Sequence, residues 1–246
     1  MTKPYRVALV TGSATGIGRA VAVRFAKEGL AVVVNYSRSE AEARETVAAV
    51  ERHGVPALLC QANVGDAAAA WDMVARCRDE LGGLDVLVNN AGTTHFIEHA
   101  NLDALTDAVW HDILQVNLLG TFYCCRAAMP LLRERQGCIV NITSAAGVQG
   151  HGSSIPYAAS KAAVNCMTKS LAKAFGPDVR VNAVAPGPVQ TRWLADHQDH
   201  VERSIQITPM RRVANPEDIA DVVAYLALGT SFVTGQILLV DGGRTM

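Results

Sequence analysis

A tyrosine and a lysine four residues apart carry the clearest chemical signal in this sequence. They bound the segment Tyr157-Ala158-Ala159-Ser160-Lys161, and in a helix this spacing places both side chains on one face. A free tyrosine has a pKa of about 10 and is a poor base at neutral pH, but a nearby fixed positive charge lowers that pKa. Tyr157 could then take a proton from an alcohol or give one to a carbonyl oxygen.

Ser144 is the second candidate for direct chemistry. It follows a predicted buried strand, Cys138–Ile142, and precedes Tyr157 by thirteen residues. At the carboxyl edge of a parallel sheet, its hydroxyl could hydrogen-bond a substrate oxygen as charge develops there. Structural roles stay open for all three residues, because Tyr157 could be a core tyrosine, Lys161 a solvated lysine and Ser144 a turn former.

A glycine-rich turn follows the first predicted strand, Val7–Val10, and reads Thr11-Gly12-Ser13-Ala14-Thr15-Gly16-Ile17-Gly18. Glycine allows positive φ, close approach of the backbone to a pyrophosphate and close packing of the next helix on the strand. The helix that follows would offer free N–H groups and its positive dipole end to the phosphates. Such glycine spacing also occurs in structural turns, but its place at the first strand–helix junction predicts nucleotide binding.

The spacing of this turn resembles that of the short-chain dehydrogenase/reductase family, and the resemblance extends along nearly the whole chain. Further matching elements are Asn89-Asn90-Ala91-Gly92, Asn117, Ser144, Tyr157 with Lys161, Pro186-Gly187 with Thr191, and Val240-Asp241-Gly242-Gly243. The resemblance implies an oxidoreductase with Asn117, Ser144, Tyr157 and Lys161 as its catalytic residues. In such an enzyme Lys161 also holds the nicotinamide ribose, and Asn117 completes a water-linked proton relay to solvent.

The resemblance also implies a set of cofactor contacts. One of these contacts has a structural alternative, since Asn90-Ala91-Gly92 could be a plain turn after a strand. The catalytic candidate Asn117 has one too, because it could bond to backbone within its helix. The implied cofactor-binding residues are Gly12, Thr15, Gly16, Ile17, Gly18, Tyr36, Arg38, Asn63, Val64, Asn90, Ala91, Gly92, Tyr157, Lys161, Pro186, Gly187, Val189 and Thr191.

The residues after the second predicted strand favour NADP(H) over NAD(H). NAD-binding members place Asp or Glu there to bind the adenosine ribose hydroxyls, whereas this chain has Asn35-Tyr36-Ser37 followed by Arg38. A guanidinium can bind a 2′-phosphate through charge-assisted hydrogen bonds. Two features weaken the prediction: Ala14-Thr15 replaces the basic residue of many NADP-binding members, and Asn63 replaces the aspartate often found beside adenine.

Within the family, the chain most resembles the 3-oxoacyl-[acyl-carrier-protein] reductases, through the segments 33–39, 208–212 and 241–243. Enzymes that reduce carrier-bound acyl groups dock an acidic partner with basic residues, and Arg133 and Arg135 could supply one of these. The turn after the catalytic helix, however, carries Asp178 instead of a base. The loop 151–156 also lacks the Asn and Gln common in that group.

We therefore predict hydride transfer between NADP(H) and a small ketone or secondary alcohol. One alternative is 3-oxoacyl-[acyl-carrier-protein] reduction in fatty-acid synthesis. An alternative from a different class is a non-catalytic dinucleotide-binding sensor, which would typically lose the tyrosine or the lysine. His151 lies in the loop between Ser144 and Tyr157 and is either a substrate contact or a surface residue.

Apolar β-rich runs and amphipathic helical runs alternate from one end of the chain to the other. This alternation predicts one α/β domain over residues 1–246, a doubly wound Rossmann-type fold with a seven-stranded parallel sheet and helices on both faces. The predicted strands are 7–10, 31–34, 57–60, 84–88, 138–142, 179–184 and 237–240. The predicted helices are 18–28, 40–53, 67–81, 105–129 and 157–175, with breaks at Gly29, Gly54, Gly82-Gly83, Pro130 and Gly176-Pro177.

One long segment without clear periodicity, about residues 186–216, is predicted to be a substrate lid. Trp193, Leu194 and His197 could line an apolar pocket there or pack the lid against the body of the protein. The long stretches 105–129 and 157–175 are rich in small apolar residues. By resemblance they pair between subunits, and a homotetramer is expected.

The composition argues against several other classes of protein. Of the 246 residues, 50% are hydrophobic and 5% aromatic, and the net charge is −1, so no field of one sign is available to hold a nucleic acid. The six cysteines show no CxxC pair and the seven histidines no ligand-like cluster, so no metal site is expected. The short apolar run near the N-terminus does not suit a signal peptide or a membrane span, and a cytoplasmic protein is expected.

Overall fold

Seven parallel strands form one sheet in the computed structural model, which describes residues 5–195 and 197–246. The strand order β3-β2-β1-β4-β5-β6-β7 is that of a doubly wound fold, as the sequence predicts. The order reverses between β1 and β4, so the loops after these two strands border the crevice where such sheets bind ligands. The strands are β1 Val7–Val10, β2 Ala31–Tyr36, β3 Ala57–Gln61, β4 Val86–Asn89, β5 Cys138–Ile142, β6 Arg180–Pro186 and β7 Ile237–Val240.

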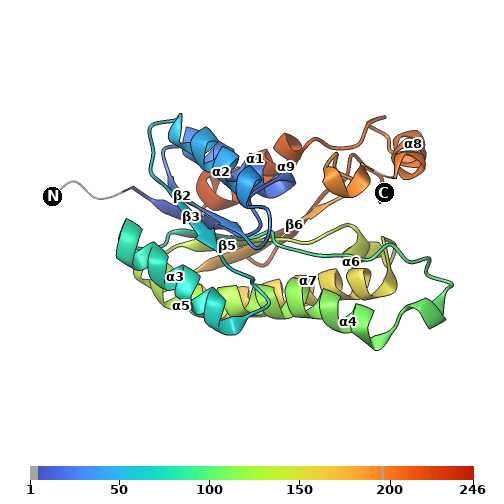
Figure 1. The fold of residues 1–246 in the computed structure, drawn as a ribbon, viewed down its shortest axis with the longest axis horizontal. Coiled ribbons are helices and arrows are strands. Elements are labelled where there is room, and N and C mark those ends of the chain that lie inside the picture. Colours follow the sequence, from blue (N-terminus) through green and yellow to red (C-terminus); the bar gives the residue numbers. More distant parts are fainter. Residues whose placement is uncertain (1–4, 196) are drawn as a thin grey trace.

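Helices cover both faces of the sheet (Figure 1). One layer contains α1 Gly16–Lys27, α2 Glu40–Glu51 and α9 Pro216–Ala224, and the other contains α3 Ala67–Leu81, α4 Asp107–Leu114, α5 Thr121–Arg135 and α7 Ile155–Phe175. Strand β1 shows how the sheet serves both layers: Ala8 and Val10 pack into the hydrophobic cluster with α1 and α9, whereas Val7 and Leu9 pack into the cluster with α3 and α5. Shorter elements are α6 Ala146–Gln149, α8 Gln198–Ile207, the 3-10 helices Leu102–Ala104 and Arg192–Leu194, and the π-helices Gln115–Gly120 and Tyr225–Gly229.

The predicted helix 105–129 and its break at Pro130 were wrong. The structure divides this stretch into α4, a π-helix over Gln115–Gly120 and α5, and α5 continues through Pro130 to Arg135. Proline removes one backbone hydrogen bond, to the carbonyl four residues earlier. Here both Pro130 and Arg126 are exposed, so water can satisfy the freed Arg126 carbonyl and the helix persists.

The predicted lid contains more regular structure than its sequence indicated. A 3-10 helix occupies Arg192–Leu194, and α8 occupies Gln198–Ile207. Several other elements differ from prediction only at their ends: β2 extends to Tyr36 and β6 to Pro186, and α7 begins at Ile155.

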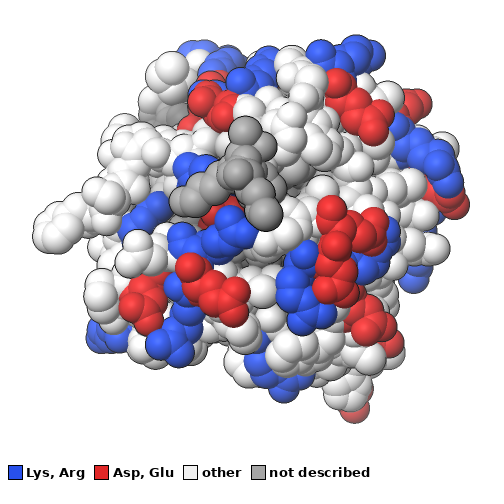
Figure 2. Space-filling view, turned by 90° about the vertical axis from the view of Figure 1, so that its left-hand side faces the viewer, with Lys and Arg blue, Asp and Glu red and all other residues white. Residues whose placement is uncertain are grey.

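Charged side chains of both signs are interspersed on the face shown in Figure 2, as the net charge of −1 suggests. Among the described residues, no helix is long and apolar enough to cross a membrane. Within the same residues, no group of three or more His, Cys, Asp or Glu side chains is placed to hold a metal ion.

Candidate active site

The glycine turn between β1 and α1 leaves no room for side chains. A Cβ on Gly12 would lie 2.9 Å from the Ala91 Cα, and one on Gly18 would lie 2.5 Å from the Gly12 carbonyl oxygen. Gly12 and Gly16 also have φ values of 62° and 58°, which other L-residues rarely adopt. The turn therefore exposes bare backbone, which suits close approach of a pyrophosphate.

Two asparagine side chains, one from buried Asn35 and one from half-buried Asn90, hold this turn through hydrogen bonds. The Asn35 Oδ1 at the end of β2 accepts a hydrogen bond from the Gly12 N–H at 3.0 Å, and its Nδ2 donates to the Ala62 carbonyl at 3.0 Å. The Asn90 Nδ2 after β4 donates to the carbonyls of Thr11 and Gly12 at 2.9 and 3.0 Å. Asn35 was missed as a site residue, and the side chain of Asn90 bonds to the turn.

Helix α1 begins at Gly16 without a side-chain cap. Its first N–H groups and positive dipole end are therefore free to face an anion. Thr191, from the segment after β6, comes close to the same point, because a Cβ on Gly16 would lie 3.2 Å from the Thr191 Cγ2. Two residues that lie far apart in the sequence, Gly16 and Thr191, thus meet at the edge of the glycine turn.

Helix α7 brings Tyr157 and Lys161 to the carboxyl edge of the sheet. The Lys161 side chain is buried, and its Nζ donates to the Ile142 carbonyl of β5 at 3.0 Å and lies 5.8 Å from the centre of the Tyr157 ring. Ser144 follows the same strand, and its hydroxyl accepts from the Ala146 N–H at 3.1 Å. The predicted helical face and strand end therefore place these side chains together.

Asn117 lies in the π-helix and is fully buried. Its Oδ1 accepts from the Thr93 N–H at 2.8 Å, and its Nδ2 donates to the Thr93 carbonyl and to the Ser160 Oγ at 3.0 and 3.1 Å. The hydrogen bonds of Asn117 to Thr93 thus position the segment after β4. Asn117 also lies close to Gly92, which is the neighbour of the Lys161 side chain. A Cβ on Gly92 would lie 3.3 Å from the Asn117 Oδ1 and 3.7 Å from the Lys161 Nζ.

The environment of the tyrosine differs from the sequence-based expectation. Burial raises the pKa of the Tyr157 phenol to about 12, and its hydrogen bond with Ser144 offsets part of that rise. Burial also lowers the pKa of the Lys161 ammonium to about 8. The expected lowering by Lys161 is absent because its ammonium is itself desolvated and turned toward the Ile142 carbonyl. The Tyr157 phenol is therefore protonated at neutral pH.

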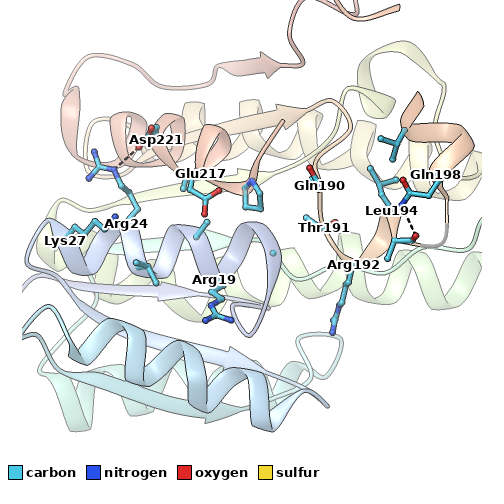
Figure 3. Close-up of a pocket in the computed structure, with 17 residues that line it drawn as sticks. Arg19, Arg24, Lys27, Gln190, Thr191, Arg192, Leu194, Gln198, Glu217 and Asp221 are labelled. Atoms are coloured by element: carbon cyan, nitrogen blue, oxygen red, sulfur yellow. Dashed lines mark hydrogen bonds and ion pairs between the residues drawn. The ribbon is translucent and has the colours of Figure 1, made fainter. Parts of the chain in front are cut away.

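Aromatic side chains from the lid cover this centre. The Trp193 ring meets the Tyr157 ring edge-on, with 6.3 Å between centroids, and the Trp193 Cη2 would lie 3.7 Å from a Cβ on Gly92. The His197 ring stacks on Phe96 at 3.9 Å. Trp193 and His197 thus pack the lid over the site. Leu194 instead lines a cavity of about 890 Å³ between the lid, α1 and α9 (Figure 3).

The remaining predicted cofactor residues lie along the same edge of the sheet or in loops beyond it. Arg38 is exposed directly after β2, where Tyr36 is buried. The Asn63 Oδ1 accepts from the Gly65 N–H at 3.0 Å and shapes its own turn. Thr15 precedes α1, and Ile17 lies within that helix. Ala91 contacts Gly12, and Val64 packs against Gly120. Pro186 ends β6, and Gly187 and Val189 follow it toward the lid. His151 is exposed in its loop.

Comparisons with known proteins agree with this geometry. Residues 12–245 match the family model described as enoyl-(acyl carrier protein) reductase. The chain is 48% identical to the granaticin polyketide synthase putative ketoacyl reductase 2 of Streptomyces violaceoruber, over 96% of this chain and 95% of that one. It is 38% identical to the 3-oxoacyl-[acyl-carrier-protein] reductase FabG of Staphylococcus aureus, over 99% of this chain and 100% of that one.

Solved structures with the same fold include two bacterial proteins. A putative short-chain dehydrogenase/reductase from Burkholderia xenovorans superposes with a TM-score of 0.92 at 37% identity, covering 98% of each chain. A short-chain dehydrogenase/reductase from Serratia marcescens superposes with a TM-score of 0.91 at 33% identity, also covering 98% of each chain. The match extends over the sheet, both helical layers and the site.

Proposed function

The chain belongs to the short-chain dehydrogenase/reductase family of oxidoreductases, and we propose that it is an NADP(H)-dependent reductase of small ketones. Membership implies a nicotinamide dinucleotide as cofactor. The observation that carries the proposal is the meeting of Tyr157, Ser144 and Lys161 beside a glycine turn that only bare backbone can form. The site retains both the tyrosine and the lysine that a non-catalytic dinucleotide sensor would typically lose.

The residues of the site divide the work of carbonyl reduction. The nicotinamide, when bound, supplies the hydride that reaches the carbonyl carbon. The Tyr157 phenol then gives its proton to the carbonyl oxygen, and the Ser144 hydroxyl stabilises the charge that develops on that oxygen. Because burial raises the pKa of Tyr157 to about 12, the phenol is protonated at neutral pH, which suits reduction. Lys161, whose Nζ lies 5.8 Å from the centre of the Tyr157 ring, would hold the nicotinamide ribose.

The choice of NADP(H) rests on the end of β2. The uncharged Asn35 lies there and uses its side chain to hold the glycine turn, and Arg38 extends into solvent two residues beyond the strand. A carboxylate at this place would repel a 2′-phosphate, whereas a guanidinium can bind it with paired hydrogen bonds. We therefore expect at least a tenfold preference for NADPH.

The substrate is proposed to be a free ketone because the charge of Arg133, one of the two arginines expected to dock a carrier protein, is paired within this chain. Arg133 forms an ion pair with Asp178 at 2.9 Å, and Arg135 donates to the Gly82 carbonyl. An acidic carrier domain that approached Arg133 would therefore meet the Asp178 carboxylate beside it. A second candidate, reduction of 3-oxoacyl groups on carrier protein, is favoured by the names of the two relatives.

Oxidation of NADPH with matched substrates tests the proposal. An acetoacetyl group would be offered as a small thioester and on acyl-carrier protein, together with a panel of cyclic ketones and both reduced cofactors. We expect kcat/KM for the small thioester or a free ketone to lie within tenfold of the carrier-linked value. A hundredfold advantage of the carrier-linked substrate, with steep salt dependence, would restore the second candidate. Equal kcat/KM for NADH and NADPH would overturn the cofactor assignment.

We also propose a homotetramer in the cytoplasm. Helices α5 and α7 lie together in one layer (Figure 1). They carry a mainly apolar groove, lined by Phe122, Cys125, Met129, Pro130, Leu171 and Phe175 together with Arg126 and Arg133. Pairing this face between subunits would bury the groove. Light scattering at micromolar concentration should give four times the chain mass, and a monomeric mass would contradict it.

A further inference from the structure

Arg192 joins two regions that lie far apart in the sequence. It is the first residue of the lid's 3-10 helix, directly after Thr191, which contacts Gly16 at the glycine turn. Its Nη1 donates to the Ser39 Oγ at 3.1 Å, in the loop between β2 and α2. Figure 3 shows the Arg192 side chain extended away from Gln190 and Thr191. The guanidinium thus spans from the lid to the loop expected to hold the adenosine ribose.

The other cations near this loop are already paired. Arg19 forms an ion pair with Glu45 at 3.3 Å, and Arg44 forms one with Glu40 at 2.6 Å. Within residues 5–195 and 197–246, neither Arg38 nor Arg192 has an ion-pair partner, and Arg192 makes only the contact with the uncharged Ser39. Arginine has five N–H donors in a planar fork that matches phosphate oxygens. Two arginines without an ion-pair partner among the described residues are thus adjacent to Ser39, Arg38 in the sequence and Arg192 through its hydrogen bond.

We propose that Arg192 is a second specificity-determining residue, which binds the 2′-phosphate of NADP(H) together with Arg38. The inference rests on the proposed use of NADP(H) and assigns the lid a part in recognising it. Arg38 directly precedes Ser39 in the sequence and Arg192 reaches Ser39 from the lid, so a dianionic phosphate bound beside Ser39 would replace a weak neutral contact with charge-assisted ones. The 2′-phosphate then also ties the lid to the body of the protein.

This arrangement couples the adenosine end of the cofactor to the reacting end. Trp193 is adjacent to Arg192 and packs on Tyr157, so fixing the Arg192 backbone fixes the ring that covers the active site. NAD(H) lacks the 2′-phosphate, so when it binds, Arg192 would hold the lid only through the hydrogen bond to Ser39 that the free protein already has. NADP⁺ should therefore protect the lid more strongly than NAD⁺ does.

Calorimetric titration with NADP⁺, NAD⁺ and the fragment 2′,5′-ADP tests the assignment without any turnover. We expect Arg192→Ala to weaken NADP⁺ and 2′,5′-ADP by about 10- to 100-fold, the usual worth of charge-assisted hydrogen bonds, and NAD⁺ by less than threefold. Arg203→Ala, which removes an exposed arginine from α8 of the same lid, is the matched control and should change none of the three. Limited proteolysis of the lid should show protection by NADP⁺ that is lost in Arg192→Ala.

The outcomes separate the inference from the proposed function. If the wild-type protein binds NAD⁺ as tightly as NADP⁺, both are overturned. If the wild-type protein prefers NADP⁺ but Arg192→Ala weakens both cofactors equally or neither, the assignment of Arg192 fails while NADP(H) dependence stands. An equal effect of Arg203→Ala would also overturn the assignment, because it would show that general lid charge is responsible.

Discussion

The glycine turn and the lid meet at the same edge of the sheet, but different contacts hold them. The turn is fixed by hydrogen bonds from two amide side chains, those of buried Asn35 and half-buried Asn90. The part of the lid nearest the site, residues 192–195 and 197, contacts the body of the protein through rings, Trp193 on Tyr157 and His197 on Phe96, and through one hydrogen bond from Arg192 to Ser39. We therefore expect the glycine turn to be more rigid than this part of the lid.

The energies of these contacts explain the difference. Removing one partner of a buried hydrogen bond leaves the other unsatisfied and costs about 1–3 kcal/mol, so a turn with several such bonds opens rarely. An aromatic pair contributes about 0.5–1.5 kcal/mol beyond the area it buries. Contacts of this size can break and reform during turnover.

The strongest test of the rigid region is Gly12→Ala. Its Cβ would meet the Ala91 backbone at 2.9 Å in a conformation with φ of 62°, so we expect a loss of about 2–4 kcal/mol in the free energy of unfolding and at least a hundredfold weaker NADP⁺ binding. Gly29→Ala is the control, because Gly29 has φ of 81° but nothing within 4 Å of its Cβ. It should lose only about 1–2 kcal/mol and keep cofactor affinity. Equal effects of the two variants would contradict a tightly fitted turn.

The buried lysine predicts a pH-dependent stability. Burial lowers the pKa of Lys161 from 10.5 to about 8, so between these values the unfolded chain holds a proton that the folded protein has released. Stability therefore rises with pH in this window, by up to about 1.4 kcal/mol per pH unit. Urea unfolding of the cofactor-free protein at pH 8, 9 and 10 measures it.

Lys161→Met is the reference for this measurement, because it removes the titrating group and keeps an unbranched side chain. The free energy of unfolding of the wild type, minus that of Lys161→Met, should increase from pH 8 to pH 10. Tyr157 does not interfere, since burial raises its pKa from 10.0 to about 12 and its contribution is lost only above pH 10. A difference that stays flat would show that Lys161 is not desolvated as described.

The smallest stability effect is expected in the lid. Trp193→Ala removes the ring that covers Tyr157, and it should raise KM for the ketone by about three- to tenfold while lowering stability by about 1 kcal/mol or less. Trp71→Ala on α3, where the indole is 45% exposed, should leave kinetics unchanged. If Trp193→Ala left KM and kcat unchanged, the conclusion that Trp193 borders the substrate would be contradicted.

Local patterns were enough to predict the glycine turn, the catalytic helix and the order of strands and helices. A helix places residues four apart on one face whatever surrounds it, so the pairing of Tyr157 with Lys161 followed from spacing alone. The role of Asn35 could not be predicted in this way. Its partners Gly12, Cys60 and Ala62 lie at the ends of β1 and β3. They meet Asn35 on β2 only after the strands pair.

Two other differences have similar physical causes. Pro130 is a helix breaker in isolation, but its exposed position within α5 makes the lost hydrogen bond tolerable. The pKa of Tyr157 depends on how deeply the phenol is buried and on where the Lys161 Nζ points. Sequence spacing determines that the two residues are neighbours and leaves both of these quantities open.

The most direct test of the account is a single-turnover measurement on Tyr157→Phe, with saturating NADPH and a reducible ketone. The rate of hydride transfer should fall by a factor on the order of 10²–10⁴, the usual contribution of a positioned acid. The Kd for NADP⁺ should stay within about threefold of the wild-type value, because the glycine turn that holds the phosphates is untouched. A variant that keeps more than a tenth of the wild-type rate would contradict the assignment of Tyr157 as the proton donor.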